Sequence, residues 1–169
     1  MVDWMIEVLT NFKCDDQSFF LAVSILDRYF KSKQERIPIS DLHAAGVTSM
    51  FISSKYEDII PLKMKRVYEK IAHKKLSVDK IKSLEMEILK VIKYRIPAPT
   101  SLDFLKVYLK EILSIGYTKR TKVDSNDKKI SKSTLPTEEA NKLLIEKMSI
   151  YLAKMALHDY DVSGKKPSL

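Results

Sequence analysis

Two oppositely charged residues interrupt apolar stretches of this sequence and could do chemistry together. Lys55 follows a run from Leu42 to Ser54 that holds no Asp, Glu, Lys or Arg, and Glu85 lies among the apolar positions of a later helix pattern. A Lys and a Glu can act as general base and acid. The sequence has no glycine-rich phosphate loop, no nucleophile–His–acid set and no metal-ligand spacing among its single Cys and three His. We therefore predict no catalytic residues, no metal site and no cofactor.

The stretch SDLHAAGVTSMFISSKYEDIIP, residues 40–61, predicts the helix around which the rest of the chain packs. Its charge-free part is unusual in a chain with 31% charged residues. Ser40 is a good N-cap and Pro61 forbids continuation, so we expect a buried helix over about 40–58. Its many Ala, Gly and Ser residues allow other helices to approach closely on all sides. Lys55 should mark the point where the helix emerges from the core.

The composition favours an all-α protein of 169 residues with one sizeable core or two small ones. Only 3 residues are Gly, and the apolar residues recur at helical rather than alternating spacing. The single Cys suits a reducing compartment, no segment is long enough to span a membrane and no signal peptide is visible. We predict an intracellular protein without a membrane partner. The net charge of +8 fits a lysine-rich solvated surface better than a nucleic-acid site.

Further helical patterns accompany the central helix in a first module, residues 1–96. Amphipathic helices are expected over residues 1–12, 15–32, 63–74 and 78–96, the last capped by Ser77 and stopped by Pro97. In that last helix Glu85 lies inside the buried face and Glu87 outside it. The first helix begins without a cap at residue 1, which suggests that the chain is cut from a longer one. Pro97 and Pro99 mark the domain boundary.

Residues 97–169 predict a second, truncated helical module. A helix should begin near Thr100 and run over residues 101–113, and a last helix should follow Pro136. Residues 114–135 are basic and poor in large apolar side chains, so we expect a flexible insert. Two helices with one apolar face each cannot bury both faces alone. The module is therefore expected to be incomplete and to leave apolar surface exposed.

The chain resembles the cyclins, and among them the A/B-type mitotic group. The resemblance rests on the segments VDWMIEV, SILDRYF, SSKYEDIIP, SLEMEILKVIKYRIPAPT and TSLDFLKVYL, which stand in the family's order. It covers nearly the whole chain outside the basic insert. It implies a five-helix cyclin box over residues 1–96, followed by the beginning of a second box. The rest of that box would follow Leu169, and the family's N-terminal helix and destruction signal would precede Met1.

The resemblance also implies a kinase-binding surface. Lys55 and Glu85 correspond to the family's Lys and Glu, which contact the backbone near the kinase's C helix; on the residues alone they could equally form an internal ion pair. The segment after Lys55 is expected to continue the surface, although Ile59 and Ile60 could equally belong to the core. The implied kinase-binding residues are Lys55, Tyr56, Glu57, Asp58, Ile59, Glu85 and Tyr94. Asp27 and Arg28 match a family pair with a structural role.

A second surface implied by the resemblance is the family's groove for Arg-x-Leu motifs of substrates and inhibitors. The matching positions are Met1, Trp4, Glu7 and His43. The function implied is that of a non-catalytic subunit that activates a cyclin-dependent protein kinase in cell-cycle control, in the nucleus or the cytoplasm. The alternative is a transcription-associated or nucleic-acid-binding protein with the same fold, to which the excess of Lys would be suited. Acids and an aromatic residue beside Lys55 favour the kinase partner over nucleic acid.

Overall fold

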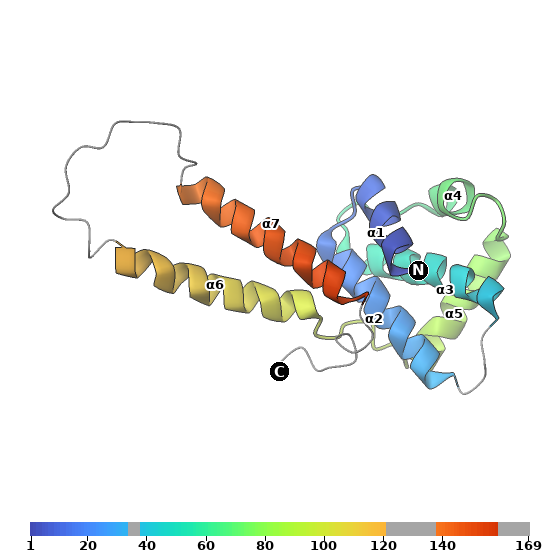
Figure 1. Ribbon diagram of the computed structural model, residues 1–169. Helices are drawn as coiled ribbons and strands as arrows, with labels where there is room; N and C mark the ends of the chain where they lie inside the picture. The colour runs from blue at the N-terminus through green and yellow to red at the C-terminus, as the bar shows by residue number, and fades with distance from the viewer. Residues whose placement is uncertain (34–37, 121–137, 159–169) are drawn as a thin grey trace. The chain divides into compact units, whose positions relative to one another are not determined.

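The described residues of this protein form helices joined by turns. The computed structural model describes residues 1–33, 38–120 and 138–158, and these contain no strand, which confirms the predicted all-α class (Figure 1). The helices are α1 Val2–Asn11, α2 Asp16–Ser32, α3 Ile39–Glu57, α4 Met64–Arg66, the π-helix Val67–Ile71, α5 Val78–Val91, α6 Ser101–Arg120 and α7 Glu138–Ala156. The chain divides into two units, Met1–Thr100 and Ser101–Leu169. No helix in the described ranges combines the length and the apolar character needed to cross a membrane.

Helix α3 is the buried centre of the first unit, as predicted. Every residue from Ala44 to Ser54 is buried, and α1, α2, the π-helix and α5 pack against α3 (Figure 1). Its buried hydroxyls are largely satisfied at short range: Thr48 Oγ1 donates to the Ala44 carbonyl at 2.8 Å, and Ser53 Oγ donates to that of Met50 at 3.0 Å. Such bonds remove most of the cost of burying a hydroxyl. Small polar residues can therefore fill the centre of the fold.

The start of α3 differs from the prediction that Ser40 is its N-cap. Pro38 occupies the N-cap position with φ −59° and ψ 146°, and Ser40 lies inside the first turn. The Pro38 carbonyl accepts hydrogen bonds from the backbone N–H groups of Asp41 and Leu42 at 2.9 and 3.2 Å. Proline fits there because the N–H it lacks would have no helical partner at this position. The carboxyl end of α3 lies where expected, at Glu57.

Two predicted helix starts are confirmed, and they fix the helices that flank α3. The Asp15 carboxylate accepts a hydrogen bond from the Gln17 N–H at 2.8 Å at the start of α2, and Ser77 Oγ accepts one from the Lys80 N–H at 3.1 Å at the start of α5. Both bonds satisfy N–H groups that a helix leaves unpaired. The core of the first unit is then closed by large apolar side chains. The largest fully buried ones are Phe19, Met5, Leu21, Ile25, Met50, Ile71, Ile81 and Ile88.

The turns between helices use left-handed backbone at residues other than glycine. Among the described residues the positive φ angles belong to Lys13, His73, Lys74, Lys93 and Tyr94, with values from 47° to 59°. After α5, the Arg28 guanidinium donates to the carbonyls of Arg95 and Ile96, the latter at 2.9 Å. This contact supports the structural role expected of Arg28. It also holds in place the turn that carries Tyr94.

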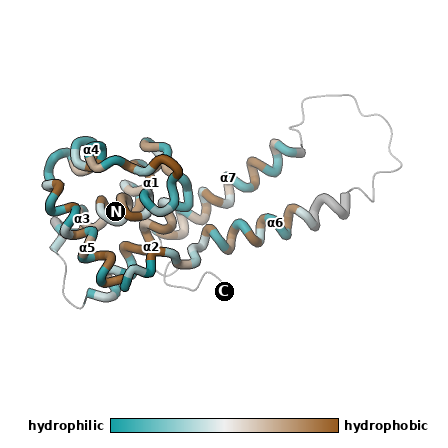
Figure 2. The backbone as a smooth tube through the Cα atoms, turned by 180° about the vertical axis from the view of Figure 1, so that it is seen from behind, coloured by the Kyte–Doolittle hydropathy of each residue, from teal (hydrophilic) through white to brown (hydrophobic). Residues whose placement is uncertain are grey.

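The second unit corrects the predicted extent of the basic insert. Helix α6 continues to Arg120, so residues 114–120 are helical, and residues 121–137 lie outside the described part of the chain. No Pro occurs between residues 101 and 135, and the single Gly116 costs a helix only about 1 kcal/mol, so the helix is not forced to end at 113. Apolar and polar residues alternate along α6 and α7 (Figure 2). Large apolar side chains on α7 are exposed by 44% to 61%: Leu143, Leu144, Ile145, Met148, Tyr151, Leu152 and Met155.

Candidate functional site

The structure joins the two charged residues that the sequence singled out. Lys55 Nζ, in the last turn of α3, and Glu85 Oε1, on α5, form a hydrogen-bonded ion pair. The Lys55 ammonium also lies 4.1 Å from the ring centroid of Phe51. The side chains are 39% and 17% exposed, respectively, so solvent and a partner can reach the pair. The pair therefore links two helices at the surface of the first unit and leaves the Lys55 side chain accessible.

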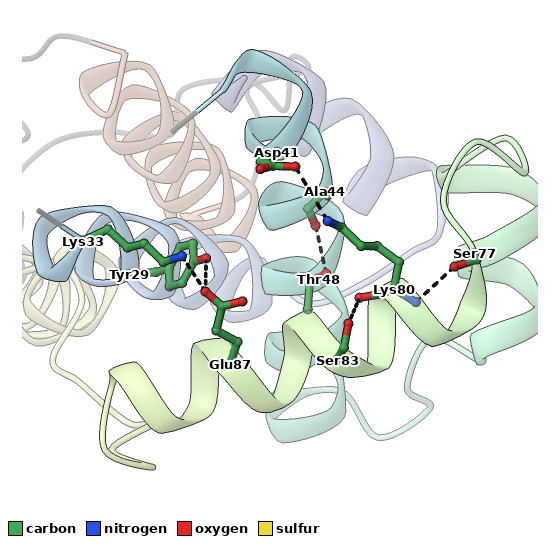
Figure 3. A network of polar contacts seen from close by, with 9 residues as sticks. All are labelled: Tyr29, Lys33, Asp41, Ala44, Thr48, Ser77, Lys80, Ser83 and Glu87. Carbon is green, nitrogen blue, oxygen red and sulfur yellow. Dashed lines mark hydrogen bonds and ion pairs between the residues drawn. The ribbon is translucent and has the colours of Figure 1, made fainter. Parts of the chain in front are cut away.

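Other polar contacts set the position of α5, and with it that of Glu85. Tyr29 Oη donates to Glu87 Oε1 at 2.9 Å, and Lys33 Nζ pairs with the same oxygen at 2.6 Å (Figure 3). The Lys33 hydrogen bond lowers the pKa of the Glu87 carboxyl below its usual value. Near the other end of α5, Lys80 Nζ lies 3.8 Å from Asp41 Oδ1 of α3. The sequence placed Glu87 outside the buried face but did not reveal that it tethers α5 to α2.

Two aliphatic side chains follow α3 without cover. Ile59 is 99% exposed and Ile60 is 81% exposed, so the alternative in which they belong to the core is wrong. The backbone leaves the helix at Asp58 in an extended conformation, with φ −79° and ψ 137°, and this carries both residues away from the core. Tyr56 is 50% exposed on the last turn of α3, whereas Glu57 is half-buried. Of this group, only Ile60 is absent from the predicted site residues.

Asp58 faces inward, toward the start of α2. Its Oδ1 accepts hydrogen bonds at 2.8 Å from both the Asp15 backbone N–H and the Ser18 hydroxyl. A carboxylate is favoured at a helix N-terminus because the unpaired N–H groups and the helix dipole are positive there. Burial and the neighbouring Asp58 carboxylate raise the pKa of the Cys14 thiol to about 12. Asp58 therefore fixes the turn from which Ile59 and Ile60 project.

An open recess lies beside these residues. It has a volume of about 490 Å³ and lies between the turn before α2 and the end of α3. Its lining comprises Lys13, Cys14, Asp15, Asp16, Glu57, Asp58, Ile59 and Ile60. In the described part of the chain no His, Cys, Asp and Glu side chains form a group that could hold a metal ion. The recess combines an acidic wall with an aliphatic edge, which suits contact with another macromolecule.

The last predicted kinase-binding residue, Tyr94, lies in the turn after α5. Its side chain is 57% exposed and its backbone is left-handed, with φ 56°. The Tyr94 N–H donates to the Leu89 carbonyl at 2.8 Å, which secures this conformation. A bulky residue in left-handed backbone is unfavourable and persists only where its surroundings impose it. Tyr94 is thus presented outward by a fixed turn.

Three of the four predicted docking-groove residues gather where α1 crosses α3. The rings of Trp4 and His43 lie 4.8 Å apart between centroids, at an interplanar angle of 42°. A Cβ at Gly46 would lie 2.9 Å from Met1 Sδ and 3.5 Å from Trp4 Cζ3, so this glycine lets α1 approach α3 closely. Met1 is 38% exposed, and the exposed Glu7 lies one helical turn after Trp4. Burial, then the charges of Lys75 and His73, lower the pKa of His43 below its usual value.

Comparison with known proteins gives a consistent result. The family described as "Cyclin, N-terminal domain" matches residues 1–97. The G2/mitotic-specific cyclin-B of Emericella nidulans is 34% identical over 106 residues, which are 63% of this chain and 22% of that protein. The G2/mitotic-specific cyclin-B1 of Oryzias latipes is 26% identical over 169 residues, 100% of this chain and 34% of that protein. The match to cyclin-A1-4 of Oryza sativa is also 26% identical over 169 residues and spans 40% of that protein.

A solved structure shares the fold. The crystal structure of a viral cyclin from herpesvirus saimiri superposes with a TM-score of 0.73 at 20% sequence identity, over 98% of this chain and 61% of that one. The present chain spans between 22% and 40% of the length of the three curated relatives above. It is therefore similar to less than half of each of these proteins.

Proposed function

This chain belongs to the cyclin family, whose N-terminal domain matches residues 1–97 of its 169, and on that premise we propose that it binds and activates a cyclin-dependent protein kinase. Cyclins are regulatory subunits, so we expect no chemistry from this chain itself. In this proposal the surface formed by Lys55, Glu85, Tyr94 and the segment from Tyr56 to Ile60 contacts the kinase. We expect the complex to act in cell-cycle control, in the nucleus or the cytoplasm.

The observation that carries the proposal is the uncovered pair Ile59 and Ile60 directly after Lys55. Burying such an aliphatic side chain is worth about 1.5–3 kcal/mol, so two of them supply the apolar centre that a stable interface needs. The accessible Lys55–Glu85 pair and the exposed tyrosines Tyr56 and Tyr94 then provide polar groups and aromatic anchors. Asp58 supports this surface from behind through its bonds to Asp15 and Ser18.

The proposed mechanism is allosteric. A protein kinase is active when its own Lys–Glu ion pair and its metal-binding Asp are both in place, and the position of its C helix controls this geometry. A rigid helical face that binds the C helix in the inward position shifts the kinase toward the active state. Helices α3 and α5 form such a face, since Glu85 links α5 to Lys55 of α3 and Glu87 links α5 to Tyr29 and Lys33 of α2. We expect an interface above about 2,000 Å² in total.

The test measures kinase affinity and kinase activity with the natural full-length protein. We expect Ile59→Ser with Ile60→Ser to weaken binding at least tenfold and to reduce activation at subsaturating cyclin. Lys55→Ala should weaken binding by about 2–5 kcal/mol, because partner groups that lose water on binding are left unpaired. The matched control changes Val107 and Ile112 of α6 to Ser, since these aliphatic side chains are 56% and 63% exposed. Unchanged affinity of the Ile59 and Ile60 variant, or an equal loss in the control, would refute the proposed surface.

We further propose that the α1–α3 crossing docks substrates or inhibitors with Arg-x-Leu motifs. Met1, Trp4 and His43 offer an apolar and aromatic contact, and the exposed Glu7 offers a carboxylate for an arginine. Trp4→Ala should then raise the Michaelis constant for a substrate with the motif and leave that for a short peptide lacking it unchanged. An equal effect on both substrates would indicate loss of fold rather than loss of docking.

A further inference from the structure

The positive charge of the first unit is concentrated in one short segment, residues 63–75, which we call the basic segment. It holds six Lys or Arg and one Glu, a net charge of +5, and the remaining 87 residues of the unit hold eleven Lys or Arg and twelve Asp or Glu, a net charge of −1. The cations are Lys63, Lys65, Arg66, Lys70, Lys74 and Lys75. The surface of this unit is therefore not evenly basic, as a merely soluble lysine-rich surface would be.

The basic segment presents its cations from a fixed backbone. It comprises α4, the π-helix and the turn that follows, and Figure 2 shows teal, the colour of hydrophilic residues, on part of the tube at α4. All six cationic side chains are exposed, whereas Val67, Ile71 and Ala72 between them are 0–2% exposed and anchor the segment in the core. The turn is secured by hydrogen bonds from the Lys74 N–H to the Tyr68 carbonyl at 2.9 Å and from the Lys75 N–H to the Ala72 carbonyl at 2.8 Å. The backbone of the segment is already ordered, so binding an anion there should cost little conformational entropy.

Within the part of the chain that the structure describes, no ion pair neutralises these cations. The first unit has ion pairs at Lys33–Glu87, Lys55–Glu85 and Lys80–Asp41, and none of these includes a cation of the basic segment. The resulting positive potential reaches a neighbouring element, because the charges of Lys75 and His73 contribute to the lowered pKa of His43 on α3. The exposed cations thus form no ion pair in the described structure. The positive charge of Lys75, one of these cations, acts on His43, whose ring contacts Trp4.

We propose that the basic segment is a docking surface for an acidic peptide segment of a partner protein, and that phosphorylated residues in that peptide strengthen the binding. Phosphoserine carries a charge of about −1.5 to −2 and three acceptor oxygens, which suit several adjacent Lys side chains. Together, α4 and the π-helix contain eight residues and are only about 12 Å long. This length is enough to contact a few phosphates or carboxylates. This surface is separate from the proposed kinase-binding residues and does not depend on them.

The charge distribution favours a peptide over a nucleic acid. Specific duplex DNA complexes bury about 1,000–2,500 Å² of protein and contact several phosphates along the backbone. Outside the basic segment the unit carries a net charge of −1, so a duplex that extended beyond the segment would gain no further electrostatic attraction there. A short acidic peptide can end where the cations end, and its apolar side chains can contact Trp4 and His43.

The experiment titrates the 169-residue chain into a fluorescein-labelled twelve-residue peptide with two phosphoserines among Asp and Glu. A second peptide has Ala at both phosphoserine positions, and a twenty-base-pair DNA duplex is the third probe. The test variant is Lys70→Gln with Lys74→Gln and Lys75→Gln. The matched control is Lys31→Gln with Lys82→Gln and Lys90→Gln, three exposed lysines of the same unit outside the basic segment. Circular dichroism and thermal unfolding verify that both variants fold.

We expect the phosphopeptide to bind more tightly than the Ala peptide and the test variant to raise its Kd about tenfold, equivalent to about 1.4 kcal/mol. The control should change the Kd less than threefold. Equal losses in both variants would indicate a non-specific effect of net charge and overturn the proposal. So would the absence of phosphopeptide binding, or binding of the duplex that is tighter than that of the phosphopeptide and equally sensitive to the test variant.

Discussion

The Lys55 ammonium and the Glu85 carboxylate form an ion pair between the end of α3 and the middle of α5, within reach of solvent. The sequence left open whether these residues form an internal pair or meet a partner. The geometry allows an internal pair in the free protein and contact with a partner in a complex. In the free protein each charge has the other as its partner. A kinase that binds here can take over some of these hydrogen bonds, because the Lys55 side chain is 39% exposed.

The first prediction concerns the stability of the free protein. Lys55→Ala and Glu85→Ala should each lower the free energy of unfolding by about 0–1 kcal/mol, as for other solvent-accessible pairs. Denaturant unfolding of both variants and of the double variant measures these losses and their coupling. Glu87→Ala is the comparison, with an expected loss of about 1–3 kcal/mol, because the Tyr29 hydroxyl loses its acceptor and Lys33 its partner. A loss of 3–5 kcal/mol for Lys55→Ala would instead identify the pair as part of the scaffold.

The second prediction is that Arg28→Lys destabilises the protein by about 1–3 kcal/mol. The planar guanidinium donates to the carbonyls of both Arg95 and Ile96, and a single ammonium group cannot reproduce that geometry. Thermal and denaturant unfolding give the loss. Lys31→Arg, at an exposed site on the same helix, should leave the stability within about 0.5 kcal/mol. A neutral Arg28→Lys change would show that the turn carrying Tyr94 holds its conformation without Arg28.

The third prediction is a dependence of stability on pH that arises from His43. The pKa of His43 in the folded protein lies below its ordinary value near 6.5, so the unfolded chain binds more protons in the interval between the two pKa values. The stabilisation is therefore complete above pH 6.5 and declines as the pH falls through that interval, by at most about 1.4 kcal/mol per pH unit for one group. Unfolding free energies between pH 7.5 and 5.5 should show the decline.

His43→Phe is the variant that isolates this effect, because it keeps a ring against Trp4 and removes the titrating group. We expect its stability to vary less over the same pH range than that of the unaltered protein. His158→Gln, at the exposed end of α7, provides the control. Identical pH profiles for His43→Phe and the unaltered protein would rule out the assignment.

The fourth prediction is that Cys14 reacts slowly in the folded protein. With a pKa of about 12, only about one thiol in ten thousand is ionised at pH 8, and the thiolate is the reactive form. Alkylation by iodoacetamide at pH 8, followed by mass spectrometry, should be far slower in buffer than in concentrated urea. Asp58→Asn should accelerate it, because the variant removes a negative charge beside the thiol, and Asp3→Asn serves as the control. Equal rates with and without urea would contradict this account.

The fifth prediction is that the 169-residue chain self-associates through its second unit. The exposed apolar side chains of α7 form an extended surface, and such surfaces commonly mediate association or aggregation. Leu144→Lys with Leu152→Lys should reduce concentration-dependent association in sedimentation velocity. Lys142→Glu with Lys154→Glu on the same helix changes charge but no apolar contact and provides the comparison. A strictly monomeric parent chain over a wide concentration range would disprove the expectation.

Much of the fold could be read from the sequence because its helices have strong local signals. The charge-free run before Lys55 predicted α3, the helical pattern after residue 15 predicted α2, and the cap Ser77 predicted the start of α5. The predicted helix bounds were wrong where two local sequence signals favoured different structures. Ser40 is an intrinsically good cap, but Pro38 takes that position, and the polar composition after residue 113 suggested a loop although nothing there prevents helix.

The candidate site was less predictable, because its geometry depends on contacts distant in the chain. Sequence spacing could not decide whether Ile59 and Ile60 were covered, since burial depends on the direction in which the chain leaves α3. The tether from Glu87 to Tyr29 spans 58 residues and has no local signature. The roles of Lys55 and Tyr94 in binding a kinase remain predictions that the experiments above address.

The five left-handed residues in the described ranges imply a trade-off between stability and recognition. Glycine adopts this backbone without strain, whereas other residues lose roughly 1 kcal/mol or more, and all five positions here carry larger side chains. At Lys13 and Lys93, replacement by glycine should relieve strain without removing a side chain named in any of the three proposed surfaces. At Tyr94 and Lys74 the same change would remove a recognition group. Selection for a more heat-resistant variant should therefore accept glycine at the first two positions and reject it at the other two whenever binding is also required.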